Sequence, residues 1–288
     1  MLLELFLTLG ALCSVLTVFL NATLVTSIFD IWIPLVLWLG YSVAFFLLYA
    51  LFFVFLSVFV DKSKPQEKPN RFYLAVFVET IALYFRLARI EIRVRGKDKV
   101  PTDSNFLLVS NHLSDHDFMS MLVTLRGRSV PFVSKPENFN KPIIGRMLHK
   151  SGFLAINRNE AREALVTIRE VANRLKTMPI SYGVFPEGTR NRESNTELLP
   201  FHEGVFLMAK KAGVPIVIVR VTGTDLVKKR APWRKTRVYV DYVDVLDAET
   251  VKAKRSHELS EMARERMEAA EGLPAVPEIR RAFKYGNN

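Results

Sequence analysis

The sequence predicts an α/β domain with a mostly parallel, mixed sheet flanked by helices, preceded by a hairpin of two transmembrane helices. Three observations lead to this prediction. Two long apolar stretches open the chain, a polar segment with two prolines follows them, and strand-like runs then alternate with helix-like stretches. Such alternation is typical of an α/β domain, because a helix carries the chain from one parallel strand to the next.

The N-terminal segment, residues 1–60, predicts a pair of helices that cross a membrane. Residues 5–29 and 31–60 contain no charged side chain, and Asp30 alone separates them. Each stretch exceeds the roughly 20 residues that a helix needs to cross about 30 Å of hydrocarbon. A signal peptide is an alternative for the first stretch, but Glu4 stands where such peptides carry basic residues. Burial of both helices in a soluble core is the other alternative, and we favour the transmembrane hairpin.

The basic flank of the hairpin predicts its orientation. A cluster of cationic side chains follows residue 60: Lys62, Lys64, Lys68 and Arg71. Because loops rich in Lys and Arg stay in the cytoplasm, both ends of the hairpin and the chain that follows are expected on the cytoplasmic face. Cys13 is the only cysteine and lies within the first apolar stretch, so no internal disulfide can form, which suits a reducing compartment.

The charge of the chain narrows the choice of partners. The formal net charge is +11, and almost all of it is carried after residue 60. Nucleic acids and anionic membranes both attract such a surface. Because the hairpin holds the domain at a bilayer, we expect the membrane lipid bilayer as a partner and no nucleic acid.

After the hairpin, a polar linker at residues 61–70 leads into a cytoplasmic domain at residues 71–288. Residues 71–89 are mostly apolar but too short for a span, which suits a core or interfacial helix. The strand-like runs that follow are residues 90–95, 106–109, 130–133, 153–156, 180–185, 214–221 and 237–245. The helix-like stretches are residues 115–125, 141–149, 160–176, 203–212 and 256–271, and a tail follows Gly272.

The stretch S-N-H-L-S-D-H-D, residues 110–117, follows one of the buried strands. If Ser114 caps the next helix, the acids at 115 and 117 fall in its first turn, where they are favoured. Asp117 could then hold one ring nitrogen of His112 and leave the other as a general base. The plainer alternative is a helix cap beside a surface histidine, and this stretch taken alone favours it.

Two other kinds of chemistry are disfavoured by the same stretch. His112 and His116 are four positions apart, as in zinc proteases, but Leu113 stands where those enzymes have Glu. No second cluster of His, Cys or acids occurs, so no metal site is expected. A serine nucleophile would need a G-x-S-x-G turn, and the chain has none. A base at His112 would therefore act on a hydroxyl group of the substrate.

Two further blocks place arginines just after predicted strands. G-F-L-A-I-N-R ends at Arg158, and F-P-E-G-T-R ends at Arg190. A guanidinium group can contact two phosphate oxygens at once, and Gly188 lets the backbone approach an anion closely. Each block alone is more typical of a solvated loop, but their order along the chain favours a shared site.

In this order, N-H-L-S-D-H-D, G-F-L-A-I-N-R, F-P-E-G-T-R and A-G-V-P-I-V-I-V resemble the four motif blocks of the glycerophospholipid acyltransferase family. The similarity is closest to the 1-acylglycerol-3-phosphate acyltransferases. It covers about residues 71–245, and the first and third blocks match at every defining position. The resemblance implies transfer of an acyl group from acyl-CoA or acyl-carrier protein to a lysophospholipid hydroxyl, with no cofactor.

The resemblance also implies roles for individual residues. His112 matches the base of the family, and Asp117 matches the acid that orients it. Pro215 matches the fourth block, which is linked to the acyl or donor side. Asp115 and His116 stand at variable positions, so we expect them to cap or solvate the helix. The residues that match the phosphate side of the acceptor site are Arg158, Glu187, Gly188, Thr189, Arg190 and, more loosely, Lys135.

Two alternatives stay open from the sequence. Within the family, the acceptor could be glycerol 3-phosphate, another lysophospholipid or an acyl-amino-acid lipid, and the four blocks do not separate these. Outside the family, a membrane-tethered module that binds anionic lipid or nucleic acid would use the basic surface. Such a module makes no use of His112 beside Asp117.

Overall fold

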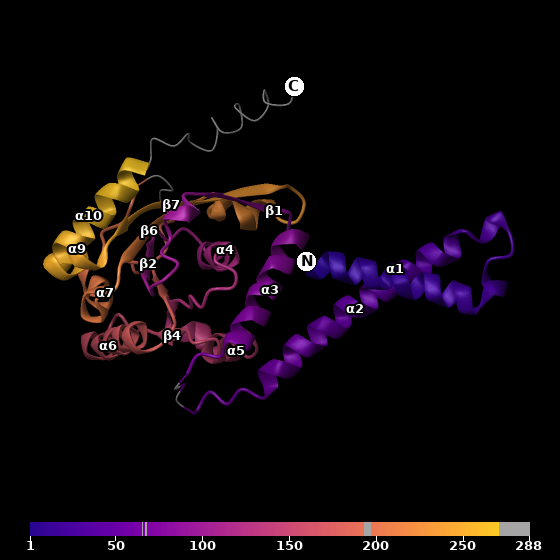
Figure 1. The fold of residues 1–288 in the computed structure, drawn as a ribbon, viewed down its shortest axis with the longest axis horizontal. Coiled ribbons are helices and arrows are strands. Elements are labelled where there is room, and N and C mark those ends of the chain that lie inside the picture. The colour runs from indigo at the N-terminus through magenta and orange to yellow at the C-terminus, as the bar shows by residue number, and fades with distance from the viewer. Residues whose placement is uncertain (65, 67, 193–196, 271–288) are drawn as a thin grey trace, which may run out of the picture.

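A computed structural model describes residues 1–64, 66, 68–192 and 197–270 (Figure 1). The helices and strands are α1 (Leu2–Leu20), α2 (Trp32–Val58), α3 (Arg71–Leu87), β1 (Ile90–Arg95), β2 (Leu107–Ser110), α4 (His116–Thr124), β3 (Val133–Ser134), α5 (Ile144–Lys150), β4 (Leu154–Ala155), α6 (Ala161–Thr177), β5 (Tyr182–Val184), α7 (Leu207–Ala212), β6 (Ile216–Thr222), α8 (Val227–Arg230), β7 (Thr236–Leu246), α9 (Ala248–Ala253) and α10 (Ser256–Ala269). Strand β1 has the expected bounds, the other expected strands and helices form with shifted ends, and residues 203–212 divide into a 3₁₀ turn (Glu203–Phe206) and α7. The expected tail lies outside the described residues.

Five strands form the main sheet in the order β1-β7-β6-β2-β5. The pairs β1–β7, β6–β2 and β2–β5 are parallel, and β6–β7 is antiparallel. Strands β3 and β4 form a separate parallel pair. The predicted fold class, a mostly parallel mixed sheet flanked by helices, is therefore confirmed.

Helices cover both faces of the sheet, which explains why its central strands are apolar throughout. In β2, Leu108 points to the face covered by α3, α4 and α5, where it joins a core that includes Phe77 and Met121. Leu107 and Val109 point to the opposite face, where α6, α7 and α10 supply the core. All three β2 side chains are fully buried.

The carboxyl ends of three parallel strands meet at one edge of the sheet. Val109 of β2 lies opposite Val184 of β5, and Ser110 lies opposite Val219 of β6. The loops that follow these strands therefore come together, which is where open α/β sheets bind ligands. His112 follows β2 at this edge.

Helices α1 and α2 form an antiparallel hairpin that projects away from the domain (Figure 1). They meet the length and hydropathy expected of membrane spans, and most of their surface is exposed. Polar side chains join the two helices, because Ser14 Oγ donates to Pro34 O (2.6 Å) and Trp38 Nε1 donates to Leu7 O (2.8 Å). Hydrogen bonds between helices are favoured where no water can compete for the polar groups.

The C-terminal part of α2 is packed against the domain. The Tyr49 hydroxyl lies 2.8 Å from Thr80 Oγ1 of α3, and the Tyr73 hydroxyl donates to Leu56 O (3.2 Å). Phe53 is only 8% exposed and belongs to the same core as α3 and α5. Helix α2 is therefore both part of the projecting hairpin and part of the domain.

The polar segment expected as a linker is held against α5 where it is described. Gln66 Nε2 donates to Lys150 O (2.7 Å), and the Asn70 N–H donates to the same carbonyl (3.0 Å). The Asn70 side chain then caps α3 by accepting from the backbone N–H groups of Phe72 and Tyr73. These contacts fix the position at which α3 begins.

Candidate active site

The first feature of the site is a hydrogen-bonded pair of His112 and Asp117. His112 Nδ1 lies 2.8 Å from Asp117 Oδ2. Asp117 is fully buried, and its Oδ2 also accepts from the backbone N–H groups of Leu113 (2.6 Å) and Ser114 (2.7 Å). The Thr224 hydroxyl donates to the other oxygen, Oδ1. This network suits an ionised, immobile carboxylate, because each contact is an N–H or O–H donor.

The geometry of the pair leaves one nitrogen of His112 available. Because the Asp117 carboxylate can only accept a hydrogen bond, we assign the His112 tautomer that carries hydrogen on Nδ1 and a lone pair on Nε2. The imidazole stacks on Phe185, with ring centroids 4.1 Å apart and planes inclined by 14°. His112 retains 15% side-chain exposure and lines a cavity. Its ring is therefore held in place while it can still contact a ligand.

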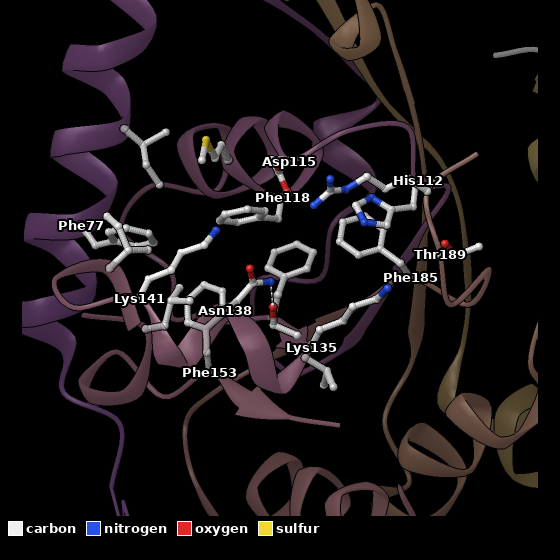
Figure 2. Close-up of a pocket in the computed structure, with 18 of the residues that line it drawn as sticks. Phe77, His112, Asp115, Phe118, Lys135, Asn138, Lys141, Phe153, Phe185 and Thr189 are labelled. Carbon is white, nitrogen blue, oxygen red and sulfur yellow. Dashed lines mark hydrogen bonds and ion pairs between the residues drawn. The ribbon is translucent and has the colours of Figure 1, made fainter. Parts of the chain in front are cut away.

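The cavity has a volume of about 830 Å³ and extends from His112 to helices α2 and α3. Figure 2 shows His112, Phe185 and Thr189 on one side of it and Phe77 on the other. The apolar part is lined by Phe53, Phe77, Ile81, Phe118, Met119, Ile144, Leu148 and Phe153. The polar lining includes Lys135, Lys141, Arg158, Thr189, Arg190 and Arg192. A ligand with an apolar chain and an anionic group matches both parts.

Arg158 is a half-buried cation of this lining. Its guanidinium group is half-buried, and burial lowers its pKa. Within the described parts of the chain, no hydrogen bond or ion pair holds this group. Gly188 adopts φ +72°, and a Cβ at this position would come within 3.3 Å of Arg158 Nη1. The glycine thus leaves room for the guanidinium group beside the loop.

Arg190 reaches the same cavity in an ion pair. Its guanidinium group pairs with Asp115, and Lys228 Nζ lies 3.7 Å from the other oxygen of Asp115. Asp115 also lines the cavity. The Asp115 carboxylate thus lies between two cationic side chains, those of Arg190 and Lys228.

Glu187 lies behind the cavity. It is 4% exposed, it is absent from the cavity lining, and its Oε1 accepts from the His112 N–H at 2.9 Å. Burial raises its pKa to about 7, opposed by the backbone N–H groups of His112 and Leu199. Glu187 therefore supports the backbone at His112 from a position where it does not touch a ligand in the cavity.

Residues 91–222 match the model of the family described as Acyltransferase. This part of the chain is therefore similar to the acyltransferase family. The matching region begins in β1 and ends with β6, so it contains His112, Asp117, Arg158 and the residues that follow β5.

Curated proteins that are similar to this region carry a common name. The human 1-acyl-sn-glycerol-3-phosphate acyltransferase alpha is 33% identical over 177 residues, which are 62% of this chain and 60% of that protein. The Escherichia coli 1-acyl-sn-glycerol-3-phosphate acyltransferase is 32% identical over 156 residues, 54% of this chain and 62% of that protein. The chain thus spans about three fifths of the length of these curated relatives.

A solved structure supports the fold. The crystal structure of the 1-acyl-sn-glycerophosphate (LPA) acyltransferase PlsC from Thermotoga maritima superposes with a TM-score of 0.58. It covers 78% of this chain and 88% of that chain at 22% identity. The chain therefore has a PlsC-like fold over most of its length.

The structure brings most, but not all, of the predicted site residues together. His112, Lys135, Arg158, Thr189 and Arg190 line the cavity. The buried members of the predicted site, Asp117, Glu187 and Gly188, lie behind this lining. Pro215 lies at the amino end of β6, where its carbonyl accepts from Leu107 N (3.0 Å). That end of the sheet is opposite to the one that carries His112.

The expectation that His116 caps or solvates the helix is wrong. The side chain is 5% exposed, its Nε2 lies 3.0 Å from the Tyr84 hydroxyl of α3, and the two rings stack. Burial lowers its pKa. The N-cap of α4 is Asp115 and not the expected Ser114, whose Oγ nevertheless accepts from His116 N (3.1 Å). His116 therefore connects the start of α4 to α3.

A pH-dependent stability difference is expected for Glu187→Gln. The pKa of Glu187 is 4.5 in the unfolded chain and about 7 in the folded protein, so the protonated side chain stabilises the fold. This contribution to the free energy of unfolding is fully present below pH 4.5 and is lost as the pH rises through about 7. Glutamine cannot ionise and still offers an oxygen to the His112 N–H. Relative to the unaltered protein, the variant should therefore become more stable between about pH 5 and 8, by up to about 3 kcal/mol.

Thermal unfolding in detergent at a series of pH values measures this difference. A difference in midpoint that stays constant from pH 5 to 8 would contradict a raised pKa at Glu187. Glu203→Gln in the 3₁₀ turn before α7 is a suitable control, because that carboxyl is exposed.

Proposed function

We propose that this protein is a membrane-bound O-acyltransferase. It moves a fatty acyl group from acyl-CoA or acyl-carrier protein to the sn-2 hydroxyl of 1-acylglycerol 3-phosphate, giving phosphatidic acid. The observation that carries the proposal is the His112–Asp117 pair at the wall of a cavity with an apolar part and a cationic part. The names of the related proteins support the same substrate class.

His112 serves as the general base in this reaction. Nε2 removes the proton from the acceptor hydroxyl as its oxygen attacks the thioester carbonyl, and a C–O bond forms. The C–S bond then breaks, and the imidazolium returns the proton to the leaving thiolate. Asp117 stabilises the positive charge on the ring and fixes the tautomer, so no acyl-enzyme is needed.

The two parts of the cavity suit the two ends of the acceptor. Arg158, with Lys135 and Arg190 nearby in the lining, supplies cations for a phosphate group. The aromatic and aliphatic side chains toward α2 and α3 provide a surface for an acyl chain. The donor thioester has to meet the acceptor hydroxyl at His112, where the two parts join.

Thiol release tests the reaction. Purified protein in detergent with oleoyl-CoA should release free CoA thiol when lysophosphatidic acid is added, and phosphatidic acid should form in equal amount. Glycerol 3-phosphate, lysophosphatidylcholine and an acyl-amino-acid lipid serve as competing acceptors. Thiol release without any acceptor, or a clear preference for one of the competing acceptors, would contradict the proposed substrate.

Replacement of Arg158 by glutamine is expected to weaken acceptor use. Loss of one charge-assisted contact costs about 1.5–3 kcal/mol, which corresponds to about 10- to 150-fold in kcat/KM for the acceptor. The KM for the acyl donor should change much less.

Arg190→Lys should also weaken activity strongly, because a point charge replaces a planar group with two contacts.

Steady-state kinetics with each substrate varied in turn measures both changes. Arg162→Gln on the exposed face of α6 is the matched control for the loss of one arginine. Unchanged acceptor kinetics in Arg158→Gln would remove this residue from the phosphate site.

The location of the enzyme is part of the proposal. The apolar hairpin crosses the membrane with both ends in the cytoplasm, and the catalytic domain lies on the cytoplasmic face. In a Cys13→Ser background, a cysteine replacing Phe29 should react with an impermeant maleimide added to intact cells. A cysteine replacing Lys64 should react only after permeabilisation, since it follows the second helix. Labelling of position 64 in intact cells would contradict this orientation.

A further inference from the structure

The segment K-K-R-A-P-W-R-K-T-R, residues 228–237, carries six cations in ten positions, and we name it the basic loop. It contains no acidic residue, and Trp233 at its centre is 84% exposed. The proposed reaction uses none of these side chains.

Part of the charge of the basic loop is compensated within the protein. Lys228 lies near Asp115, while Lys235 Nζ and Arg237 Nε lie 2.8 and 3.5 Å from Glu91. In the described residues, no acidic side chain pairs with the other three cations of the loop, Lys229, Arg230 and Arg234. These three charges are thus available to an external anionic surface.

Two contacts place the basic loop beside the base of the hairpin. Arg89 Nη1 donates to Trp233 O (3.1 Å), and Arg89 O accepts from Thr236 N (3.0 Å). Arg89 lies two residues beyond the end of α3, in which Arg86 pairs with Glu4 of α1 at 2.8 Å. In Figure 1 the chain between α8 and β7 lies at the same end of the domain as the start of α1.

We propose that the basic loop docks onto the anionic surface of the bilayer that holds the hairpin. Trp233 lies in the headgroup region, where tryptophan is favoured, and Lys229, Arg230 and Arg234 contact anionic headgroups. We favour a lipid surface over other anionic partners because the loop is positively charged and lies next to the apolar hairpin. Because Lys228 reaches Asp115 at the cavity, docking holds the cavity mouth near the surface that carries the lipid substrate.

This inference rests on the membrane location proposed above, and fluorescence tests it separately. The chain has three tryptophans, and Trp32→Phe with Trp38→Phe leaves Trp233 as the only one. The full chain is reconstituted into phosphatidylcholine vesicles with or without 30% phosphatidylglycerol. On the anionic vesicles, Trp233 emission should shift to the blue, be quenched by lipids brominated near the headgroup, and return toward that of water-exposed tryptophan at high salt.

A charge-neutral variant supplies the second measurement. The triple substitution Lys229→Gln, Arg230→Gln and Arg234→Gln should lower the ratio of docked to free loop by roughly fivefold for each charge removed. The matched control removes three exposed cations from α6 on the other side of the domain: Arg162→Gln, Arg169→Gln and Lys176→Gln. That control should leave the Trp233 quenching unchanged.

Vesicle flotation separates the possible results. Protein that floats with both kinds of vesicle, with Trp233 protected only on the anionic one, supports the proposal. Protein that floats while Trp233 stays open to iodide overturns docking and leaves the hairpin proposal standing. Protein that does not float with anionic vesicles overturns both proposals. A Trp233 response to RNA oligonucleotides with none to anionic vesicles would show a nucleic-acid surface and overturn the lipid assignment.

Discussion

Replacement of His112 by alanine is expected to lower acyl transfer by about 10²–10⁴-fold, the range of general-base assistance. The imidazole is the group on the cavity wall whose tautomer is fixed by a buried carboxylate and whose second nitrogen faces the ligand space. No neighbouring histidine replaces it, because His116 is buried against Tyr84. The effect should fall on kcat, since the base acts when the hydroxyl attacks.

The measurement is thiol release at saturating donor and acceptor, with thermal unfolding as a check on folding. His257→Ala is the matched control, because that histidine is exposed on α10. Full activity in His112→Ala would remove the proposed mechanism. An acyl group trapped on the enzyme with donor alone would contradict direct transfer to the acceptor.

Replacement of Asp117 by asparagine should have a comparable effect on turnover and an additional effect on stability. The carboxylate accepts from His112, from two backbone N–H groups and from the Thr224 hydroxyl. The side-chain amide of asparagine would direct its own N–H group at one of these donors. At least one N–H or O–H group would then face another donor in a buried place and lack an acceptor. The unpaired groups cost about 1–3 kcal/mol, and the imidazolium loses the charge that stabilises it.

Thr224→Val separates the two effects of this substitution. It removes only the hydroxyl that contacts Asp117 Oδ1, at a position that is fully buried, and it keeps the shape of the side chain. We expect a modest loss of both thermal stability and kcat from Thr224→Val and a loss of at least 10²-fold in kcat from Asp117→Asn. Equal activity losses in the two variants would show that Asp117 acts only as a structural support.

The order of strands and helices was predictable because the hydrophobic period changes clearly along the chain. Strand β2 is apolar at successive positions, as a strand covered on both faces must be. The His112–Asp117 pair was predictable because both residues belong to one strand-to-helix turn, five positions apart. Local sequence patterns were thus sufficient to predict both the order of the elements and the His112–Asp117 pair.

Contacts between distant segments were not predictable in the same way. The pair of Asp115 and Arg190 joins residues 75 positions apart, and neither sequence neighbourhood indicates the other. Thr224 carried one usable signal, because it follows the carboxyl end of β6 just as His112 follows that of β2. The same reasoning places Pro215, at the amino end of β6, away from the cavity. That inference requires knowing that β6 is the neighbour of β2 and parallel to it.

Phe53 gives the hairpin a further consequence for engineering and inhibitor discovery. Because this residue of α2 is both part of the domain core and part of the cavity lining, a shortened chain without residues 1–60 would lack part of the cavity wall. Compounds selected against such a soluble fragment would be ranked on a surface that the intact protein does not have. If the cavity holds the acyl chain as proposed, substitutions at Phe53 are expected to alter which chain lengths are accepted, although the residue lies in a helix that the sequence alone would assign to anchoring.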